Sequence, residues 1–291
     1  MKKTPGDYAF DIINTIFMWF MIIITLYPFI YVVMASLSTP KLFLAHTGLL
    51  FKPVGFSLES YEAVLRNPNI KIGYLNTLFV VIVGTFFNVI ATSIGAYVLS
   101  RKGPFWKGPL MVVIVITMFV DGGLVPNYLL VQNLGLYNSR WALILPGLIS
   151  TYNMIVMRTA FQGIPESLEE SARIDGANDW TILFKVIIPL AIPTMAVISL
   201  FYAVSHWNSW FSAMIYLKDK TKYPLQLILR DIIVQSQVSD MTTMDSYMDR
   251  YAVSQTVKYA TIMVATIPIL CVYPFLQKYF VKGVMIGAVK G

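Results

Sequence analysis

Three glutamates begin a short polar stretch that separates two long apolar segments. Glu166, Glu169 and Glu170 lie in its N-terminal half, and Arg173 lies near its far end. Because a helix dipole favours negative charge at its N-terminus, this charge pattern predicts a short helix. A rigid helix with carboxylates along one side is suited to transmitting force to a protein partner.

Proline and glycine set the ends of this predicted helix. Pro165 can occupy the first turn at no cost, because the first N–H groups of a helix have no intrahelical partner. Gly176 can adopt the tight conformation that ends the helix, and Asn178 or Asp179 can cap a second helix that begins near Trp180. The sequence thus predicts a helix, a hinge and another helix. An ordinary cytoplasmic helical hairpin is the alternative interpretation.

The chain contains no recognisable catalytic or metal-binding arrangement of residues. It has no GxxxxGK[ST] phosphate-binding loop, so ATP binding by that route is not expected. His46 and His206 are the only histidines, and neither has metal-ligand spacing around it. The single cysteine, Cys271, excludes an intrachain disulfide framework. We therefore expect a protein that is not an enzyme and binds neither a metal nor a cofactor.

Polar side chains inside apolar segments form a second group of candidates, because such residues are functional by default. Gly84, Asn88 and Thr92 recur every four residues and so share one helix face. This stripe either lines a transport path or forms a close helix–helix contact, which small residues favour.

Further candidates lie in three later apolar segments. Asp121 and Asn127 flank a Gly-Gly break, and a carboxylate at that depth needs a partner or water. Tyr152 and Asn153 lie near the middle of the next segment. The last group combines hydrogen-bonding side chains with flat aromatic rings, which suits sugar hydroxyls and sugar ring faces: Ser205, His206, Trp207, Asn208, Ser209 and Trp210. Trp207 and Trp210 could instead be anchors of an interfacial aromatic belt.

The composition indicates that membrane-spanning helices position these residues. The chain of 291 residues is 57% hydrophobic and 13% charged, and its mean hydropathy is +0.66. Soluble domains carry about 25% charged residues, so the chain is expected to be a polytopic membrane protein in the lipid bilayer. The net charge is +7, but the basic residues lie at segment ends, which excludes a nucleic-acid surface.

Six apolar segments approach or exceed the roughly 20 residues that span a bilayer. They are residues 12–36, 74–99, 109–131, 140–160, 186–215 and 259–281. The third contains a helix breaker at membrane depth, Asp121 to Asn127, which is tolerated only beside protein or water.

Basic residues predict the orientation of these segments. They cluster before the first segment, between the second and third, around the polar stretch and at the end of the chain: Lys2, Lys3, Arg101, Lys102, Lys107, Arg158, Arg173, Lys185, Lys278, Lys282 and Lys290. Both termini and a loop at 161–188 are therefore expected to be cytoplasmic. The long link 216–257 is expected to be external, either folded against the mouth of the pathway or solvated.

The polar stretch resembles the EAA signature of the membrane-spanning subunits of ABC importers. Glu170-Ser171-Ala172 is followed by three residues, Gly176, nine residues and Val186-Ile187-Ile188-Pro189. The resemblance implies that a coupling helix inserts into a cleft of a separate ATPase. The residues implied in coupling are Glu169, Glu170, Ser171, Ala172, Asp175, Gly176 and Pro189.

Other segments resemble carbohydrate importers of the maltose-permease type, in the branch associated with complex oligosaccharides. The similar stretches are residues 27–29, 122–126, 164–177, 223–227 and the tail 277–291. The resemblance implies a heterodimer with a second homologous permease, two ATPase subunits that hold ATP and Mg²⁺, and an extracytoplasmic sugar-binding protein.

Together these observations predict an all-α, six-helix permease of the type I ABC importer kind, in which residues 1–291 form a single transmembrane domain. It would carry oligosaccharides across the bacterial cytoplasmic membrane by alternating access. The alternative is a proton- or sodium-coupled sugar carrier that uses Asp121 as its ion-linked group. A secondary carrier has no use for the coupling segment.

Overall fold

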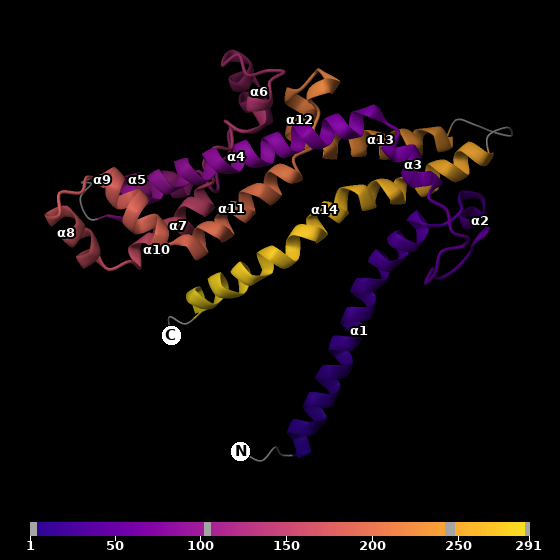
Figure 1. The fold of residues 1–291 in the computed structure, drawn as a ribbon, viewed down its shortest axis with the longest axis horizontal. Coiled ribbons are helices and arrows are strands. Elements are labelled where there is room, and N and C mark those ends of the chain that lie inside the picture. Colours follow the sequence, from indigo (N-terminus) through magenta and orange to yellow (C-terminus); the bar gives the residue numbers. More distant parts are fainter. Residues whose placement is uncertain (1–4, 102–105, 242–247, 289–291) are drawn as a thin grey trace. The chain divides into compact units, whose positions relative to one another are not determined.

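The computed structural model describes residues 5–101, 106–241 and 248–288, most of which are helical (Figure 1). Within these ranges there is no strand beyond an isolated bridge between Ser38 and Phe56. The all-α class predicted from the sequence is therefore confirmed. Lys2, Lys3, Lys102 and Lys290, which contribute to the predicted orientation, lie outside the described residues, as does the end of the tail, 289–291.

The α-helices are α1 (Pro5–Ser36), α2 (Pro40–Ala45), α3 (Glu59–Leu65), α4 (Pro68–Ser100), α5 (Lys107–Ile116), α6 (Leu124–Asn133), α7 (Thr151–Gln162), α8 (Glu166–Ile174), α9 (Asp179–Ile182), α10 (Ile188–Leu190), α11 (Ile192–Trp207), α12 (Phe211–Tyr216), α13 (Leu225–Met241) and α14 (Met248–Ala288). Two 3₁₀ turns, η1 (Arg140–Leu143) and η3 (Lys220–Lys222), and one π-helical turn, η2 (Leu183–Ile187), are the other helical elements within the described ranges.

These elements form two compact units. The first comprises Met1–Ile70 and Leu229–Pro268, and the second comprises Lys71–Ile228 and Ile269–Gly291. In the first unit, the Tyr259 ring of α14 packs edge-on against Tyr31 of α1, with ring centroids 5.7 Å apart. Most of α1 is apolar and exposed, as expected of a helix that faces lipid or other membrane helices.

Three helices in the described part of the chain are long and apolar enough to cross a membrane. They cover Gly6–Ser36, Pro68–Ser100 and Val253–Cys271, and they include or overlap the predicted segments 12–36, 74–99 and 259–281. A bent pair, Asp179–Leu190 with Ile192–Trp207, would make a fourth span if counted as one.

Two of the predicted segments are not single helices. Segment 109–131 divides into α5 and α6 at the predicted Asp121-Gly122-Gly123 break, where Gly123 has φ +85°. Segment 140–160 divides into the turn η1 and helix α7, because the chain between them contains Pro146 and Gly147. Proline removes a backbone donor and clashes with the preceding turn, which stops a helix at this point.

The predicted segment 186–215 is also interrupted. The axes of Asp179–Leu190 and Ile192–Trp207 meet at 88°, and Ala191 lies at the bend between Pro189 and Pro193. The arm on the N-terminal side of this bend contains the π-helical turn η2. Pro189 therefore belongs to an arm that is continuous with the polar stretch, whereas α11 contributes Ile198 and Tyr202 to a hydrophobic core of the second unit.

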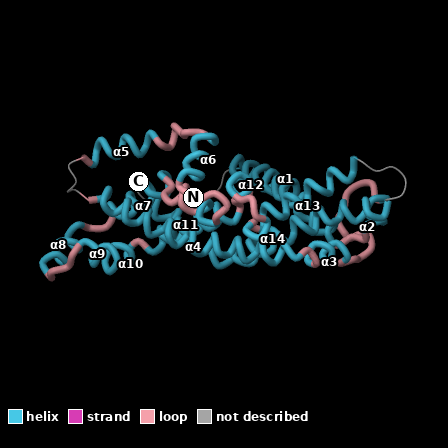
Figure 2. The backbone as a smooth tube through the Cα atoms, turned by 90° about the horizontal axis from the view of Figure 1, so that it is seen from above, coloured by secondary structure: helices cyan, strands magenta, loops and turns pink. Residues whose placement is uncertain are grey.

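Helix α4 connects the two hydrophobic cores of the second unit. Near its C-terminal end, Ala96 and Leu99 pack with residues of α7, α9 and α11, among them Phe161 and Ile182. Near its N-terminal end, Val80 packs with residues of α6, η1 and α12. Helices α8, α9 and α10 lie at one end of this unit, away from α12 (Figures 1 and 2).

The start of the predicted external link folds back on α4. Asn76 donates from Nδ2 to the carbonyl oxygens of Thr221 and Tyr223 at 2.8 and 3.0 Å. Thr77 Oγ1 accepts from the backbone N–H of Leu225 at 2.8 Å, and the Leu225 side chain is fully buried. This part of the link is packed structure rather than a solvated loop.

Candidate coupling helix and transport cavity

Helix α8 has the ends that its sequence predicts. Pro165 occupies the N-cap position, and Glu166 and Glu169 lie in the first turn, where the helix dipole favours negative charge. At the other end, Gly176 has φ +83°, and the N–H of Ala177 donates to the carbonyl of Ala172 at 2.9 Å. This left-handed closure satisfies carbonyls that the helix end would otherwise leave without partners.

The second predicted helix is also present. Asn178 accepts a hydrogen bond at Oδ1 from the N–H of Thr181 at 2.8 Å and so caps α9, which begins at Asp179. The rings of Trp180 and Phe184 stack one turn apart, with centroids separated by 6.2 Å. The helix–hinge–helix arrangement predicted from the sequence is confirmed in its local geometry.

The predicted coupling residues divide into an outward-facing group and an inward-facing group. Glu170, Ser171, Asp175, Gly176 and Pro189 are exposed. Ala172 packs partly against the core, and Glu169 is buried.

Glu169 pairs with three polar side chains among the described residues. Its Oε2 lies 3.1 Å from Arg101 Nε, and its Oε1 accepts hydrogen bonds from Arg173 Nη2 at 3.0 Å and from Tyr97 Oη at 3.3 Å. Arg173 also donates to Asp179. Hydrogen bonds to Glu169 and Asp179 raise the pKa of the Arg173 guanidinium above its ordinary value, so it stays charged.

Two exposed apolar side chains extend the outward face of this segment. Ile174 is 87% exposed and Trp180 is 59% exposed, although both lie in an otherwise polar stretch. Neither was predicted as a coupling residue. The sequence does indicate them, because each is a large apolar side chain close to the hinge glycine in a polar stretch, where it cannot be part of a hydrophobic core. Apolar residues at the centre of a polar surface are typical of protein interfaces.

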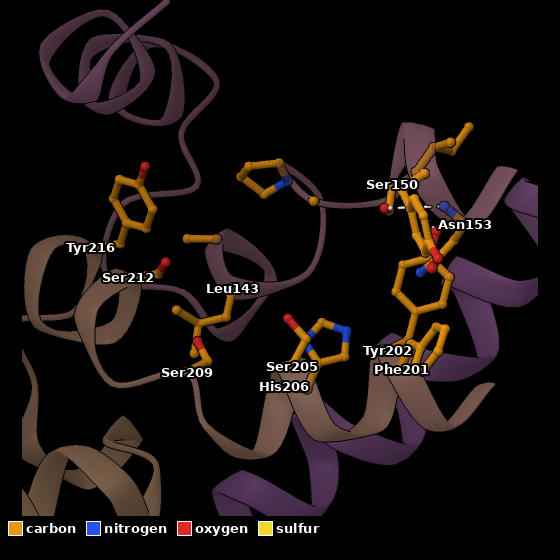
Figure 3. Close-up of a pocket in the computed structure, with 15 residues that line it drawn as sticks. Leu143, Ser150, Asn153, Phe201, Tyr202, Ser205, His206, Ser209, Ser212 and Tyr216 are labelled. Atoms are coloured by element: carbon orange, nitrogen blue, oxygen red, sulfur yellow. Dashed lines mark hydrogen bonds between the residues drawn. The ribbon is translucent and has the colours of Figure 1, made fainter. Parts of the chain in front are cut away.

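A cavity of about 680 Å³ lies between the chain from η1 to α7 and the helices α11 and α12 (Figure 3). Hydroxyl groups form much of one wall, with residues at intervals of three or four positions: Tyr202, Ser205, Ser209, Ser212 and Tyr216. Among the described residues that line the cavity there is no Lys, Arg, Asp or Glu. The cavity thus offers neutral hydrogen-bonding groups and ring faces, which suit a polyhydroxylated ligand.

Buried contacts from α4 hold the wall of this cavity. Asn88 donates from Nδ2 to the carbonyls of Gly147 and Leu148, both at 2.8 Å, and its Oδ1 lies 2.7 Å from Nε2 of His206. One turn further along α4, the Thr92 hydroxyl lies 2.7 Å from the hydroxyl of Tyr202. Buried polar groups must be paired in this way, because an unpaired one is costly.

The structure brings only some of the predicted path residues together. Tyr152, Asn153 and His206 line the cavity. Asn88 and Thr92 are fully buried behind its wall, which favours the helix-contact interpretation of their stripe. Trp207, Asn208 and Trp210 are not among the lining residues, and the Trp207 ring lies 6.5 Å from Tyr74.

Asp121 and Asn127 lie apart from the cavity, at the break between α5 and α6. Asp121 Oδ1 accepts from the N–H of Gly123 at 2.6 Å and from Asn127 Nδ2 at 3.3 Å. Both side chains are exposed in this chain. The carboxylate therefore organises the turn that begins α6.

Sequence reasoning named Ser205 and Ser209 but missed Ser212 and Tyr216, which continue the series at intervals of three and four residues. Ser209 lies in the break between α11 and α12, so these residues do not share the face of one helix. Tyr202 could not be recognised, because its role depends on contacts with Thr92 and with the N–H of Ser150, both distant in sequence.

Comparisons with known proteins agree with this geometry. Residues 88–286 match the family described as binding-protein-dependent transport system inner membrane component. The chain is 43% identical to the polygalacturonan/rhamnogalacturonan transport system permease protein of Bacillus subtilis, over 97% of this chain and 98% of that relative. It is 37% identical to the protein LplC of the same organism, over 100% of this chain and 98% of that relative.

A solved structure is similar along nearly the whole chain. It belongs to a bacterial ABC transporter involved in the import of the acidic polysaccharide alginate. The TM-score is 0.87 and the identity is 33%, and the match covers 96% of this chain and 99% of that one.

Proposed function

The chain belongs to the family of binding-protein-dependent transport system inner membrane components, and from this membership we propose that it carries oligosaccharides derived from acidic polysaccharides. It is a multi-pass membrane protein and a permease subunit of an ABC importer. The observation that carries the importer class is helix α8, which is followed by the turn at Gly176 and presents an exposed face beside an apolar core. An ion-coupled carrier has no need of such a segment.

The class of substrate is inferred from two independent features. A relative that is 43% identical is named for polygalacturonan and rhamnogalacturonan transport, and a chain that is 33% identical belongs to an alginate importer. The cavity between the chain from η1 to α7 and helices α11 and α12 offers hydroxyl, amide and aromatic groups. Such a lining suits the hydroxyl groups and apolar ring faces of a sugar chain.

The lining also limits what this subunit does with substrate charge. The described lining residues include no cationic Lys or Arg, so this wall binds the sugar through neutral hydrogen bonds. We assign the balancing of the negative charge on substrate carboxylates to other parts of the importer. Neutral contacts are weaker than charge-assisted ones, which suits a site that a substrate must leave as well as enter.

The remaining parts of the proposal concern partners and orientation. A second homologous permease completes the pathway, and two ATPase subunits bind ATP and Mg²⁺ and receive α8 through Glu170, Ile174 and Trp180. An extracytoplasmic binding protein delivers the sugar to the side of the link 216–257. Both termini lie in the cytoplasm, and transport follows alternating access.

Reconstitution tests this function directly. The subunit is co-expressed with its partner permease, ATPase and binding protein, and the purified complex is placed in proteoliposomes. We expect an oligogalacturonide-loaded binding protein to stimulate ATP hydrolysis and ATP-dependent uptake, both unaffected by proton and sodium ionophores. Uptake that proceeds without ATP would contradict the proposal. A maltooligosaccharide that is taken up better than the oligogalacturonide would contradict the acidic substrate class alone.

A further inference from the structure

Glu169 and Glu170 are adjacent in sequence and have opposite surroundings. The Glu170 side chain is exposed on α8, where a partner subunit can reach it. The Glu169 side chain is only 11% exposed. Its partners are Tyr97 of α4, Arg101 directly after α4, and Arg173 of α8. A residue enclosed in this way has little surface left for a partner protein.

The contact between Glu169 and Arg101 is an enclosed ion pair. The Arg101 side chain is 14% exposed, and its Nε lies 3.1 Å from Glu169 Oε2 without the alignment of a hydrogen bond. The guanidinium also lies over the Tyr97 ring, with Cζ 5.3 Å from the ring centroid. Exclusion of water strengthens the attraction between the two charges and makes either charge costly without the other.

Tyr97 lies in the last turn of α4, the helix that supports the cavity, and Arg101 directly follows its last residue, Ser100. Thr92 and Asn88, further back along α4, contact Tyr202 and His206 in the cavity wall. At 1.5 Å per residue, Tyr97 and Asn88 are separated by about 14 Å along the helix. A movement of the C-terminal end of α4 therefore reaches the wall through a continuous helix and two buried hydrogen-bonded pairs.

We infer that Glu169 and Arg101 form a positioning pair that ties α8 to α4, so that a displacement of α8 moves the cavity wall. Glu170 and the exposed apolar residues receive the force, and Glu169 passes it to the membrane-spanning part of the same subunit. This inference rests on the proposed function, because it assumes that α8 is displaced by an ATPase.

The test compares the number of sugars taken up per ATP hydrolysed by the reconstituted complex, with oligogalacturonide as substrate. The variants are Glu169→Gln, Arg101→Met, the neutral pair Glu169→Gln with Arg101→Met, and the reversed pair Glu169→Arg with Arg101→Glu. Glu166→Gln is the control, because it removes one exposed negative charge from the same helix. Co-purification with the ATPase and thermal unfolding are measured for every variant.

We expect both single variants to retain the ATPase and to lose at least about fivefold in sugars per ATP, with the control unchanged. The neutral pair should regain thermal stability but remain uncoupled, and the reversed pair should regain coupling. Recovery of coupling in the neutral pair would show that the ion pair serves stability alone and would overturn the inference.

Loss of the ATPase from Glu169→Gln but not from Arg101→Met would also overturn it, because Glu169 would then contact the ATPase directly. If the single variants do not fold, Tyr97→Phe removes one hydroxyl from the same cluster and should lower sugars per ATP by a smaller factor. An unchanged ratio in Tyr97→Phe would then overturn the inference. Failure of the proposed function is distinguishable, because the wild-type complex itself would show no ATP-dependent uptake.

Discussion

Nε2 of His206 lies 2.7 Å from Oδ1 of Asn88, and this pair joins α11 to α4 at the wall of the cavity. The close approach of the two helices depends on Gly84, one turn before Asn88. A Cβ atom at Gly84 would lie 2.6 Å from His206 Nε2. The pair and the glycine together fix the distance between the helices.

Replacement of Gly84 by alanine should therefore be costly. We expect Gly84→Ala to lower the free energy of unfolding by roughly 1–3 kcal/mol, because overpacking displaces a buried side chain. Gly95→Ala on the same helix is the control, since its nearest neighbour is Met154 Sδ at 3.1 Å, the flexible part of a side chain. Thermal unfolding in detergent compares them, and equal losses in both variants would contradict the prediction.

The hydroxyl groups of the cavity should contribute to sugar binding during uptake. We expect Ser205→Ala and Ser209→Ala each to raise the KM for oligogalacturonide uptake roughly two- to tenfold, which corresponds to about 0.5–1.5 kcal/mol for one hydrogen bond. Ser199→Ala is the control, because Ser199 lies on α11 but is not among the lining residues. Unchanged KM values in both cavity variants would remove this wall from the substrate path.

The hinge of the coupling segment should tolerate only glycine. Gly176→Leu places a branched side chain at φ +83°, and Glu170→Lys reverses an exposed charge. We expect both variants to reach the membrane and to lose binding-protein-stimulated ATP hydrolysis and uptake. Gly163→Leu is the control, because Gly163 has φ −74°, which any residue adopts. Normal transport in Gly176→Leu and Glu170→Lys would contradict the coupling role.

Asp121 should not be essential for accumulation of substrate. Its carboxylate accepts hydrogen bonds from the N–H of Gly123 and from Asn127, and the amide of Asp121→Asn can still accept at its oxygen. We expect Asp121→Asn to retain at least about half of the uptake rate, since an ATP-driven importer needs no ion-linked carboxylate there. Uptake assays with and without a proton ionophore measure this. Loss of accumulation in the variant would revive the ion-coupled alternative.

The predicted topology can be tested with single cysteines in a Cys271→Ser background. An impermeant thiol reagent applied to intact cells should label Lys220→Cys, in the link expected to be external. It should label Ser171→Cys on α8 only after the membrane is opened. Both positions are exposed in this chain, so access depends on the side of the membrane. Labelling of Ser171→Cys in intact cells would reverse the orientation and remove the coupling role.

Features that depend on local backbone chemistry could be predicted from the sequence. The closure of α8 at Gly176, the Asn178 cap and the break before Leu124 each follow from residues within one or two turns. The burial of Glu169 could not be predicted, because its main partner Arg101 is distant in sequence. A glutamate beside the signature glutamate looks like a second surface charge until the fold brings the arginine to it.

Long-range packing also explains why the segment 140–160 is not the single membrane-spanning stretch that its composition predicts. Its apolar composition is that of a membrane span, but the backbone carbonyls of Gly147 and Leu148 are satisfied by Asn88 of another helix. Non-helical backbone is tolerated inside a membrane protein when such a partner is available. Composition alone does not reveal the partner.

The 88° bend at Ala191 makes the two helices on either side of it the arms of an L-shaped lever. The arm Asp179–Leu190 and the helix Ile192–Trp207 are about 18 Å and 24 Å long at 1.5 Å per residue. If the two helices rotate together as one rigid body about Ala191, the displacement of the Trp207 end is about one third larger than the displacement of the far end of the arm. The direction of motion changes by a right angle, so a force applied across the arm becomes a displacement of the Trp207 end perpendicular to the helix Ile192–Trp207.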